Sequence, residues 1–194
     1  MRKWLAVTGG IGSGKSCVLD ILKERGYPVF SCDEIYKEII QSAGYIQKIE
    51  KKFPTCVENG AINRVRLAEM IFQDESNRTA LNDIAHPLIM DRLFYLMENC
   101  GNEIAFAEVP LLFEGNYEKD FDGVIVILRK REQRINAVAL RNKISKEEAT
   151  ARILAQFDYD DESNKIRFEN CNAILIENNG DLEELKTKIN NLIF

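Results

Sequence analysis

Residues 4–17 have the sequence WLAVTGGIGSGKSC, in which an apolar run ends in a cluster of glycines. Gly9, Gly14, Lys15 and Ser16 match the pattern G-x-x-x-x-G-K-[S/T] of a phosphate-binding loop. Glycine lets the backbone turn its N–H groups inward around an anion, and a following helix presents unpaired N–H groups to the same anion. The stretch therefore predicts a strand, a phosphate-binding loop and a helix that together bind a nucleoside triphosphate.

The motif also predicts roles for individual side chains. Lys15 is expected to reach the β- and γ-phosphates of ATP, and the Ser16 hydroxyl is expected to ligate Mg²⁺. Apolar residues at helical spacing follow the loop, and Gly26 is expected to end that helix. The predicted nucleotide-binding residues of the loop and the first helical turn are Gly10, Ile11, Gly12, Ser13, Gly14, Lys15, Ser16 and Cys17.

Composition excludes several classes of protein. A chain of 194 residues with 45% hydrophobic residues fits one domain with elaborations. A net charge of −5 gives no overall basic field for nucleic acid, and no apolar run approaches the ~18 residues that span a bilayer. The five cysteines lack a C-x-x-C pair, and His86 is the single histidine, so disulfide and His-based metal sites are not expected. We expect a cytoplasmic monomer or small homo-oligomer that binds neither nucleic acid nor membrane.

Further apolar runs predict four more strands, at residues 27–31, 104–109, 124–128 and 173–176. Helical patterns separate them, which is typical of a three-layer α/β/α fold of the P-loop NTPase class with a five-stranded parallel sheet. Residues 43–100 are mostly helical, with a loop at 54–60 and a break or kink near Pro87. Because this block is longer than a crossover needs, we interpret it as an inserted acceptor-binding region.

Residues 129–158 are rich in arginine and lysine and predict two helices, at 132–141 and 146–158. Ser145 and Glu148 fit a capping box at the start of the second helix. The pair could be a solvated charged surface, but the phosphate-binding loop favours a mobile lid over the phosphates. The predicted organisation is a core of residues 1–42, 101–128 and 159–194, an acceptor-binding region of residues 43–100 and a lid of residues 129–158.

Transfer of a phosphoryl group to a hydroxyl needs a carboxylate that accepts the hydroxyl proton. Asp33 follows the second strand, at the sheet edge where ligands bind in open α/β folds. The same residue could merely cap its helix, and position alone does not separate the two interpretations. Glu108, near the end of the third strand, is an alternative base or a neighbour of Mg²⁺.

Several motifs in a fixed order give the chain a family resemblance. They are TGGIGSGKS at 8–16, Cys32-Asp33, IAHP at 84–87, VPLLFE at 109–114, RILAQ at 152–156 and ENNG at 177–180. In this order they resemble the dephospho-coenzyme A kinases over nearly the whole chain. The resemblance implies ATP-dependent phosphorylation of the ribose 3′-hydroxyl of dephospho-coenzyme A, with ATP as phosphate donor and Mg²⁺ as cofactor.

The resemblance also implies roles for residues outside the loop. Asp33 would be the base, Arg141 and Arg152 would act from the lid, and Asn178 would lie near the adenine of ATP. The chain departs from the family pattern at Cys17, Ser31, Ala137 and Ala173. The predicted catalytic residues are Lys15, Asp33 and Arg141, and the predicted substrate-binding residues are Thr8, Asp33, Arg64, His86, Pro87, Glu108 and Leu111.

Two other functions stay open at this point. One is a small-molecule P-loop kinase of the nucleoside monophosphate kinase type, and the other is a non-catalytic ATP-binding module. The absence of an N-K-x-D motif argues against a signalling GTPase, because Asn142-Lys143-Ile144-Ser145 differs from that motif at its last residue.

Overall fold

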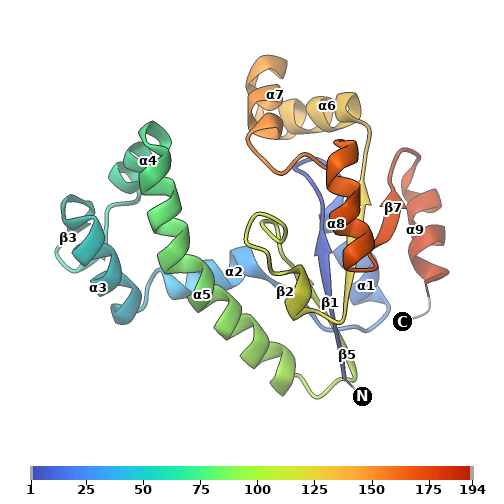
Figure 1. Cartoon of the computed structure of the whole chain (residues 1–194), viewed down its shortest axis with the longest axis horizontal. Helices are drawn as coiled ribbons and strands as arrows, with labels where there is room; N and C mark the ends of the chain where they lie inside the picture. The colour runs from blue at the N-terminus through green and yellow to red at the C-terminus, as the bar shows by residue number, and fades with distance from the viewer. Residues whose placement is uncertain (1, 193–194) are drawn as a thin grey trace. The chain divides into compact units, whose positions relative to one another are not determined.

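The computed structural model describes residues 2–192 (Figure 1). A five-stranded sheet has the order β2-β5-β1-β6-β7, and the pairs β1–β5, β1–β6 and β6–β7 are parallel. This confirms the predicted fold class and places the first strand at the centre of the sheet. The strands are β1 (Lys3–Thr8), β2 (Val29–Ser31), β5 (Ile104–Glu108), β6 (Gly123–Leu128) and β7 (Ile174–Glu177).

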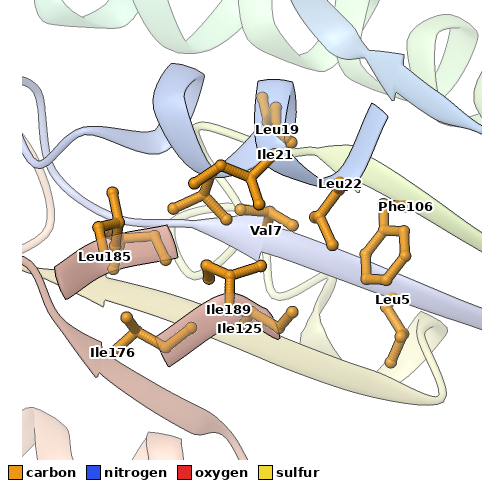
Figure 2. Close-up of a cluster of buried hydrophobic side chains, with 12 residues drawn as sticks. Leu5, Val7, Leu19, Ile21, Leu22, Phe106, Ile125, Ile176, Leu185 and Ile189 are labelled. Carbon is orange, nitrogen blue, oxygen red and sulfur yellow. The ribbon is translucent and has the colours of Figure 1, made fainter. Parts of the chain in front are cut away.

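The core that fixes the phosphate-binding loop lies between β1 and two helices, α1 (Lys15–Glu24) and α9 (Leu182–Asn190). Figure 2 shows Leu5 and Val7 of β1 packed with side chains of α1 and with Ile189 of α9. Burying one such side chain contributes about 1.5–3 kcal/mol. Because β1 and α1 are both anchored in this core, the loop between them has little freedom to move away.

Contacts divide the chain into two compact units, Met1–Phe30 with Cys100–Phe194 and Ser31–Asn99. The second unit is mainly helical and includes α2, which precedes the predicted acceptor-binding region. Its helices are stabilised by buried apolar faces and, in α4, by the N-cap Asn63, whose side chain accepts a hydrogen bond from the N–H of Arg66. The unit contains α2 (Cys32–Ile39), α3 (Ala43–Lys52), η1 (Pro54–Cys56), β3 (Val57–Glu58), β4 (Ala61–Ile62), α4 (Arg64–Gln73) and α5 (Glu75–Asn99).

Two predictions about this unit were wrong. The predicted loop at 54–60 contains the first strand of a small antiparallel hairpin, which turns at Asn59 and Gly60 with φ values of 51° and 74°. Strands of two residues are too short to show an alternating pattern. The sequence predicted a break or a kink near Pro87, and the break is absent, because α5 is one continuous helix through that residue. Buried residues on both sides of Pro87, such as Ala85 and Ile89, hold the helix together despite the lost hydrogen bond.

The rest of the first unit consists of short helices around the lid segment. Ser145 and Glu148 form the predicted capping box at the start of α7. The predicted helix 146–158 ends earlier, at Leu154, and the next residues contact the phosphate-binding loop and the turn after β5. Within residues 2–192, no helix is long and apolar enough to cross a membrane. The elements are η2 (Glu118–Asp120), α6 (Arg131–Asn142), α7 (Lys146–Leu154), η3 (Glu162–Asn164) and α8 (Lys165–Asn170).

Candidate active site

The phosphate-binding loop has a backbone that only glycine adopts readily. Gly9, Gly12 and Gly14 have φ values of 145°, 79° and 99°. A Cβ at Gly12 would lie 2.9 Å from the carbonyl oxygen of Arg134, so a side chain there would also collide with α6. The loop therefore depends on its glycines for its conformation and for the close approach of neighbouring segments.

The start of α1 is open to an anion. Gly14 is the N-cap, no side chain caps the helix, and no acidic residue lies in its first turn. The Nζ atom of Lys15 donates to the carbonyl oxygens of Gly9 at 2.7 Å and Gly10 at 3.4 Å, which holds the ammonium over the loop. Ser16 and Cys17 are exposed in the same turn. Uncapped N–H groups, a cation and a hydroxyl thus surround one position, as phosphate binding requires.

Side chains from the lid segment hold the loop by its backbone. The N–H of Ile11 donates to Oε1 of Gln156 at 2.8 Å, and Nε of Arg134 donates to the carbonyl oxygen of Ile11 at 3.1 Å. A guanidinium nitrogen of Arg129 donates to the carbonyl oxygen of Gly12 at 3.2 Å. The sequence did not predict that any of these three side chains contacts the loop, although Gln156 belongs to the RILAQ motif.

Arg134 is a buried cation directly behind the loop. Its residue exposure is only 2%, and its NH1 nitrogen lies 3.7 Å from Oδ2 of Asp160. Its NH2 nitrogen is buried and has no hydrogen-bond partner among the described residues. Burial lowers the pKa of this arginine, but a guanidinium keeps its proton in proteins. The loop therefore has a fixed positive charge next to the carbonyl oxygen of Ile11.

Asn178 supports the loop from β7. Its Nδ2 atom donates to the carbonyl oxygen of Ser13 at 2.8 Å, and the residue is 9% exposed. Its predicted place near the adenine stays a prediction. The structure assigns its amide nitrogen to holding the loop.

Three predicted acceptor-side residues, Thr8, Glu108 and Leu111, lie at or just beyond the ends of β1 and β5. Glu108 is the last residue of β5 and pairs in register with Val7 of β1. Thr8 is fully buried, and its hydroxyl lies 3.0 Å from the hydroxyl of Tyr159, so it is engaged within the protein. Leu111 is half-buried in the turn after β5. Of these side chains, the carboxylate of Glu108 is the one whose chemistry suits Mg²⁺.

The predicted lid arginines are both exposed. Arg141 is exposed in the last turn of α6, where its Nε donates to Oδ1 of Asn142 at 3.2 Å. It follows Arg134 by two helical turns, about 10 Å along the axis. Arg152 is exposed on α7. Among residues 2–192, neither side chain forms a hydrogen bond with the loop, whereas Arg134 does.

The remaining candidates belong to the helical unit. Asp33 is the second residue of α2, whose N-cap is Ser31, and Arg64 is the first residue of α4. Both line one cavity of about 710 Å³. His86 is half-buried and Pro87 exposed in the middle of α5. The cavity therefore brings together the predicted base and one predicted acceptor-binding residue.

The described residues contain no group of three or more His, Cys, Asp or Glu side chains that could hold a metal ion. The five cysteines are free thiols in the described residues. Mg²⁺ at a phosphate-binding loop needs only one or two protein ligands, because phosphate oxygens and water complete its shell.

The chain is similar to known proteins over most of its length. A family model described as dephospho-CoA kinase matches residues 3–184. A curated dephospho-CoA kinase from Fusobacterium nucleatum is 33% identical over 187 residues, which cover 95% of this chain and 94% of the relative. A crystal structure from Thermus thermophilus matches with a TM-score of 0.81 and 29% identity, over 97% of this chain and 95% of that one. The dephospho-CoA kinase from Campylobacter jejuni matches with a TM-score of 0.66 and 26% identity, over 97% and 94%.

Proposed function

The chain belongs to the dephospho-CoA kinase family, and we propose how its residues divide the ATP-dependent phosphorylation of the ribose 3′-hydroxyl of dephospho-coenzyme A. The reaction yields coenzyme A and ADP. The observation that carries the proposal is the loop itself, where Lys15 and the uncapped start of α1 face one anion-binding position. Different residues bind ATP, hold Mg²⁺ and accept the proton of the hydroxyl.

On the donor side, the N–H groups of residues 10–17 bind the phosphates of ATP. The ammonium of Lys15 now bonds carbonyl oxygens of the loop, and it exchanges these for the β- and γ-phosphate oxygens when ATP binds. Phosphoryl transfer depends on positioning and fixed positive charge, so Lys15 and the buried guanidinium of Arg134 both favour the negative charge of the transferring group. Arg141 and Arg152 act from the lid when it closes over ATP.

The residues beside the loop fit Mg²⁺. The hydroxyl of Ser16 and the carboxylate of Glu108 are hard oxygen ligands of the kind that Mg²⁺ prefers. Mg²⁺ bound there would neutralise charge on the phosphate oxygens. We assign Ser16 as a direct ligand and Glu108 as a ligand held directly or through water.

On the acceptor side, Asp33 removes the proton from the 3′-hydroxyl. Its carboxylate is exposed and accepts no hydrogen bond from any described residue, so it is available to a substrate hydroxyl. Its position two residues after the end of β2 places it at the carboxyl end of a strand, where open α/β sheets bind ligands. We further propose that the enzyme is a cytoplasmic monomer or small homo-oligomer.

An assay of ADP release with Mg-ATP tests the function, with dephospho-coenzyme A compared against AMP, CMP, adenosine and shikimate. We expect ADP only with dephospho-coenzyme A, together with coenzyme A as the second product. Faster turnover of a nucleoside monophosphate would support the alternative kinase type. ATP binding without release from any acceptor would support a non-catalytic module.

A further inference from the structure

A short segment after α7 contacts two parts of the active site that are far apart in the chain. Residues 156–159 follow α7 without helix or strand, and we call them the strap. The strap contacts the start of the phosphate-binding loop and also the turn of residues 109–114, which follows β5. The loop, the turn and the strap all belong to the unit Met1–Phe30 with Cys100–Phe194, so these contacts lie within one compact unit.

Two side chains connect the strap to the donor side of the site. Oε1 of Gln156 accepts the N–H of Ile11 at 2.8 Å, and the hydroxyl of Tyr159 lies 3.0 Å from the hydroxyl of Thr8. Thr8 is 0% exposed and Tyr159 is 5% exposed, so this hydroxyl pair is shielded from solvent. Burial raises the pKa of Tyr159, which keeps its hydroxyl protonated and able to donate. The end of β1 and the loop are therefore both held by the strap.

Phe157 connects the strap to the turn after β5. Its N–H donates to Oε1 of Glu114 at 2.9 Å. Its ring stacks on the ring of Phe113, with the ring centroids 4.9 Å apart, and Tyr159 meets Phe113 edge-on at 6.0 Å. Phe113 is fully buried, and aromatic pairs of both geometries are favourable. A shift of the turn would consequently move the strap with it.

The strap thus joins the loop to the turn over a very short length of chain. Gln156 holds Ile11 of the loop, and the next residue, Phe157, holds the turn. Their α-carbon atoms are separated by only about 3.8 Å, because they are neighbours in the chain. The ladder between β1 and β5 ends at the register pair Val7–Glu108, so the loop and the turn both lie beyond it. In that region the strap joins the two segments.

Phosphoryl transfer requires the attacking hydroxyl, the phosphorus and the leaving oxygen to lie roughly in line. We propose that Gln156, Phe157 and Tyr159 are positioning residues, which set the place of the γ-phosphate held by the loop relative to the acceptor held at the turn. The proposal rests on the function proposed above and on the predicted contact of Leu111 with the acceptor. The strap acts through the loop and the turn and touches neither reacting atom.

A positioning role has a kinetic signature that separates it from binding and from folding. Loss of a strap contact lets the loop and the turn move relative to each other, while each keeps its own binding groups. We therefore expect kcat to fall, whereas the Kd values of a non-hydrolysable ATP analogue and of dephospho-coenzyme A stay within about twofold of wild type. A contact that only stabilised the fold would lower Tm and leave the kcat of the folded enzyme unchanged.

Glu114 offers the test of the turn side, because it is exposed and its substitution disturbs no core. Glu114→Met removes the acceptor of the Phe157 N–H, and we expect kcat to fall about 10- to 100-fold. Glu114→Gln keeps an acceptor oxygen without the charge and should recover most of that loss. Glu162→Met is the control, because Glu162 is exposed and pairs with Lys165 outside the strap. Equal kcat in Glu114→Met and Glu162→Met, or no recovery in Glu114→Gln, would overturn the role of this contact.

Tyr159 offers the test of the loop side. Tyr159→Phe removes one hydroxyl and keeps the ring that packs on Phe113, and we expect kcat to fall about tenfold. Thr8→Val removes the partner hydroxyl with little change of shape. Because the two hydroxyls act as one contact, the double variant should be no slower than the slower single variant. Losses that multiply, or a raised Kd for the ATP analogue with unchanged kcat, would overturn the positioning role of Tyr159.

A second pair of variants tests whether the strap works as one connection. Gln156→Met frees Ile11, and Glu114→Met frees the turn. Either loss already disconnects the loop from the turn, so the double variant should again be no slower than the slower single variant. Multiplied losses would show two separate contacts and overturn the strap as a single connection.

The strap and the proposed function fail in different ways. Turnover of dephospho-coenzyme A by the wild-type enzyme tests the function, whereas the strap is tested by the ratio of variant to wild-type kcat. If a nucleoside monophosphate proved to be the acceptor, the proposed function would fail and the strap variants should still lower kcat. Unchanged kcat in these variants, with turnover of dephospho-coenzyme A intact, would overturn the strap alone.

Discussion

Asp33 and Glu108 are the two carboxylates that could accept the proton of the acceptor hydroxyl. Asp33 lines the cavity of about 710 Å³ in the helical unit and accepts no hydrogen bond from the described residues, whereas Glu108 ends β5 beside the first strand. On these surroundings we propose Asp33 for the acceptor hydroxyl and Glu108 for the metal. The helix-cap interpretation of Asp33 is also weakened, because the N-cap of α2 is Ser31.

We predict that Asp33→Asn lowers kcat by about 10²- to 10⁴-fold, because an amide cannot accept the hydroxyl proton. The measurement is kcat at saturating ATP and dephospho-coenzyme A. Glu108→Gln is the comparison variant, and it should instead raise the Mg²⁺ concentration needed for half-maximal rate. If Glu108→Gln removes activity at every Mg²⁺ concentration while Asp33→Asn keeps it, the two roles are exchanged.

Arg134 acts through the loop it supports. Its Nε bonds the carbonyl oxygen of Ile11, and its burial leaves little room for another side chain to replace it. We predict that Arg134→Met raises the KM for ATP about tenfold, the cost of one hydrogen bond from a charged donor. Arg131→Met is the control, because Arg131 is an exposed arginine of the same helix that pairs with Asp158 and Asp160. A similar KM for both variants would show that the loop does not need Arg134.

At the scale of elements, the lid segment of residues 129–158 also supports the phosphate-binding loop. Residues of α6 and the segment after α7 bond both backbone groups of Ile11, and the two helices are joined by a short turn with Lys143 in the left-handed conformation. The lid segment therefore contacts the loop directly. A less stable α7 should consequently weaken the contacts that hold the phosphate-binding loop as well as those within the lid segment.

The capping box offers a direct test. Ser145 accepts a hydrogen bond from the N–H of Glu148 at 3.1 Å, and Glu148 accepts one from the N–H of Ser145 at 3.0 Å. We predict that Ser145→Ala destabilises α7 by about 1 kcal/mol. Amide hydrogen exchange across residues 146–154 measures the effect, with Lys146→Ala as the control in the same turn. Equal exchange rates in the two variants would mean that packing alone holds this helix.

At the scale of the molecule, the phosphate-binding loop and the cavity lined by Asp33 belong to different compact units. The unit Met1–Phe30 with Cys100–Phe194 holds the loop, and the unit Ser31–Asn99 holds the cavity. Binding one substrate should therefore order one unit more than the other.

Hydrogen exchange of the whole protein tests this separation. We predict that a non-hydrolysable ATP analogue slows exchange mainly in residues 9–17. Dephospho-coenzyme A alone should slow exchange mainly in residues 33–41 and 60–71, which line the cavity. Protection of both regions by either ligand alone would show that the units bind substrate as one body.

The sequence by itself determined the elements whose signals are local. The strand, glycine loop and helix of residues 3–24 followed from an apolar run, the loop motif and helical spacing. The capping box of Ser145 and Glu148 followed from residue type and spacing. The order of short motifs was enough to identify the family. Each of these signals lies within a few residues, where backbone conformation depends on immediate neighbours.

Only the tertiary structure decided which distant side chains meet. Gln156 and Arg134 reach Ile11 across 145 and 123 residues of chain, and Asn178 reaches Ser13 across 165. The contact of Arg134 with the loop was not predicted from the sequence, whereas the role of Arg141 at the phosphates stays a prediction. Lys37 and Arg64 likewise share a cavity that no spacing rule predicts. Such contacts arise because helices and strands pack through their buried apolar faces, and that packing fixes polar neighbours that local sequence does not encode.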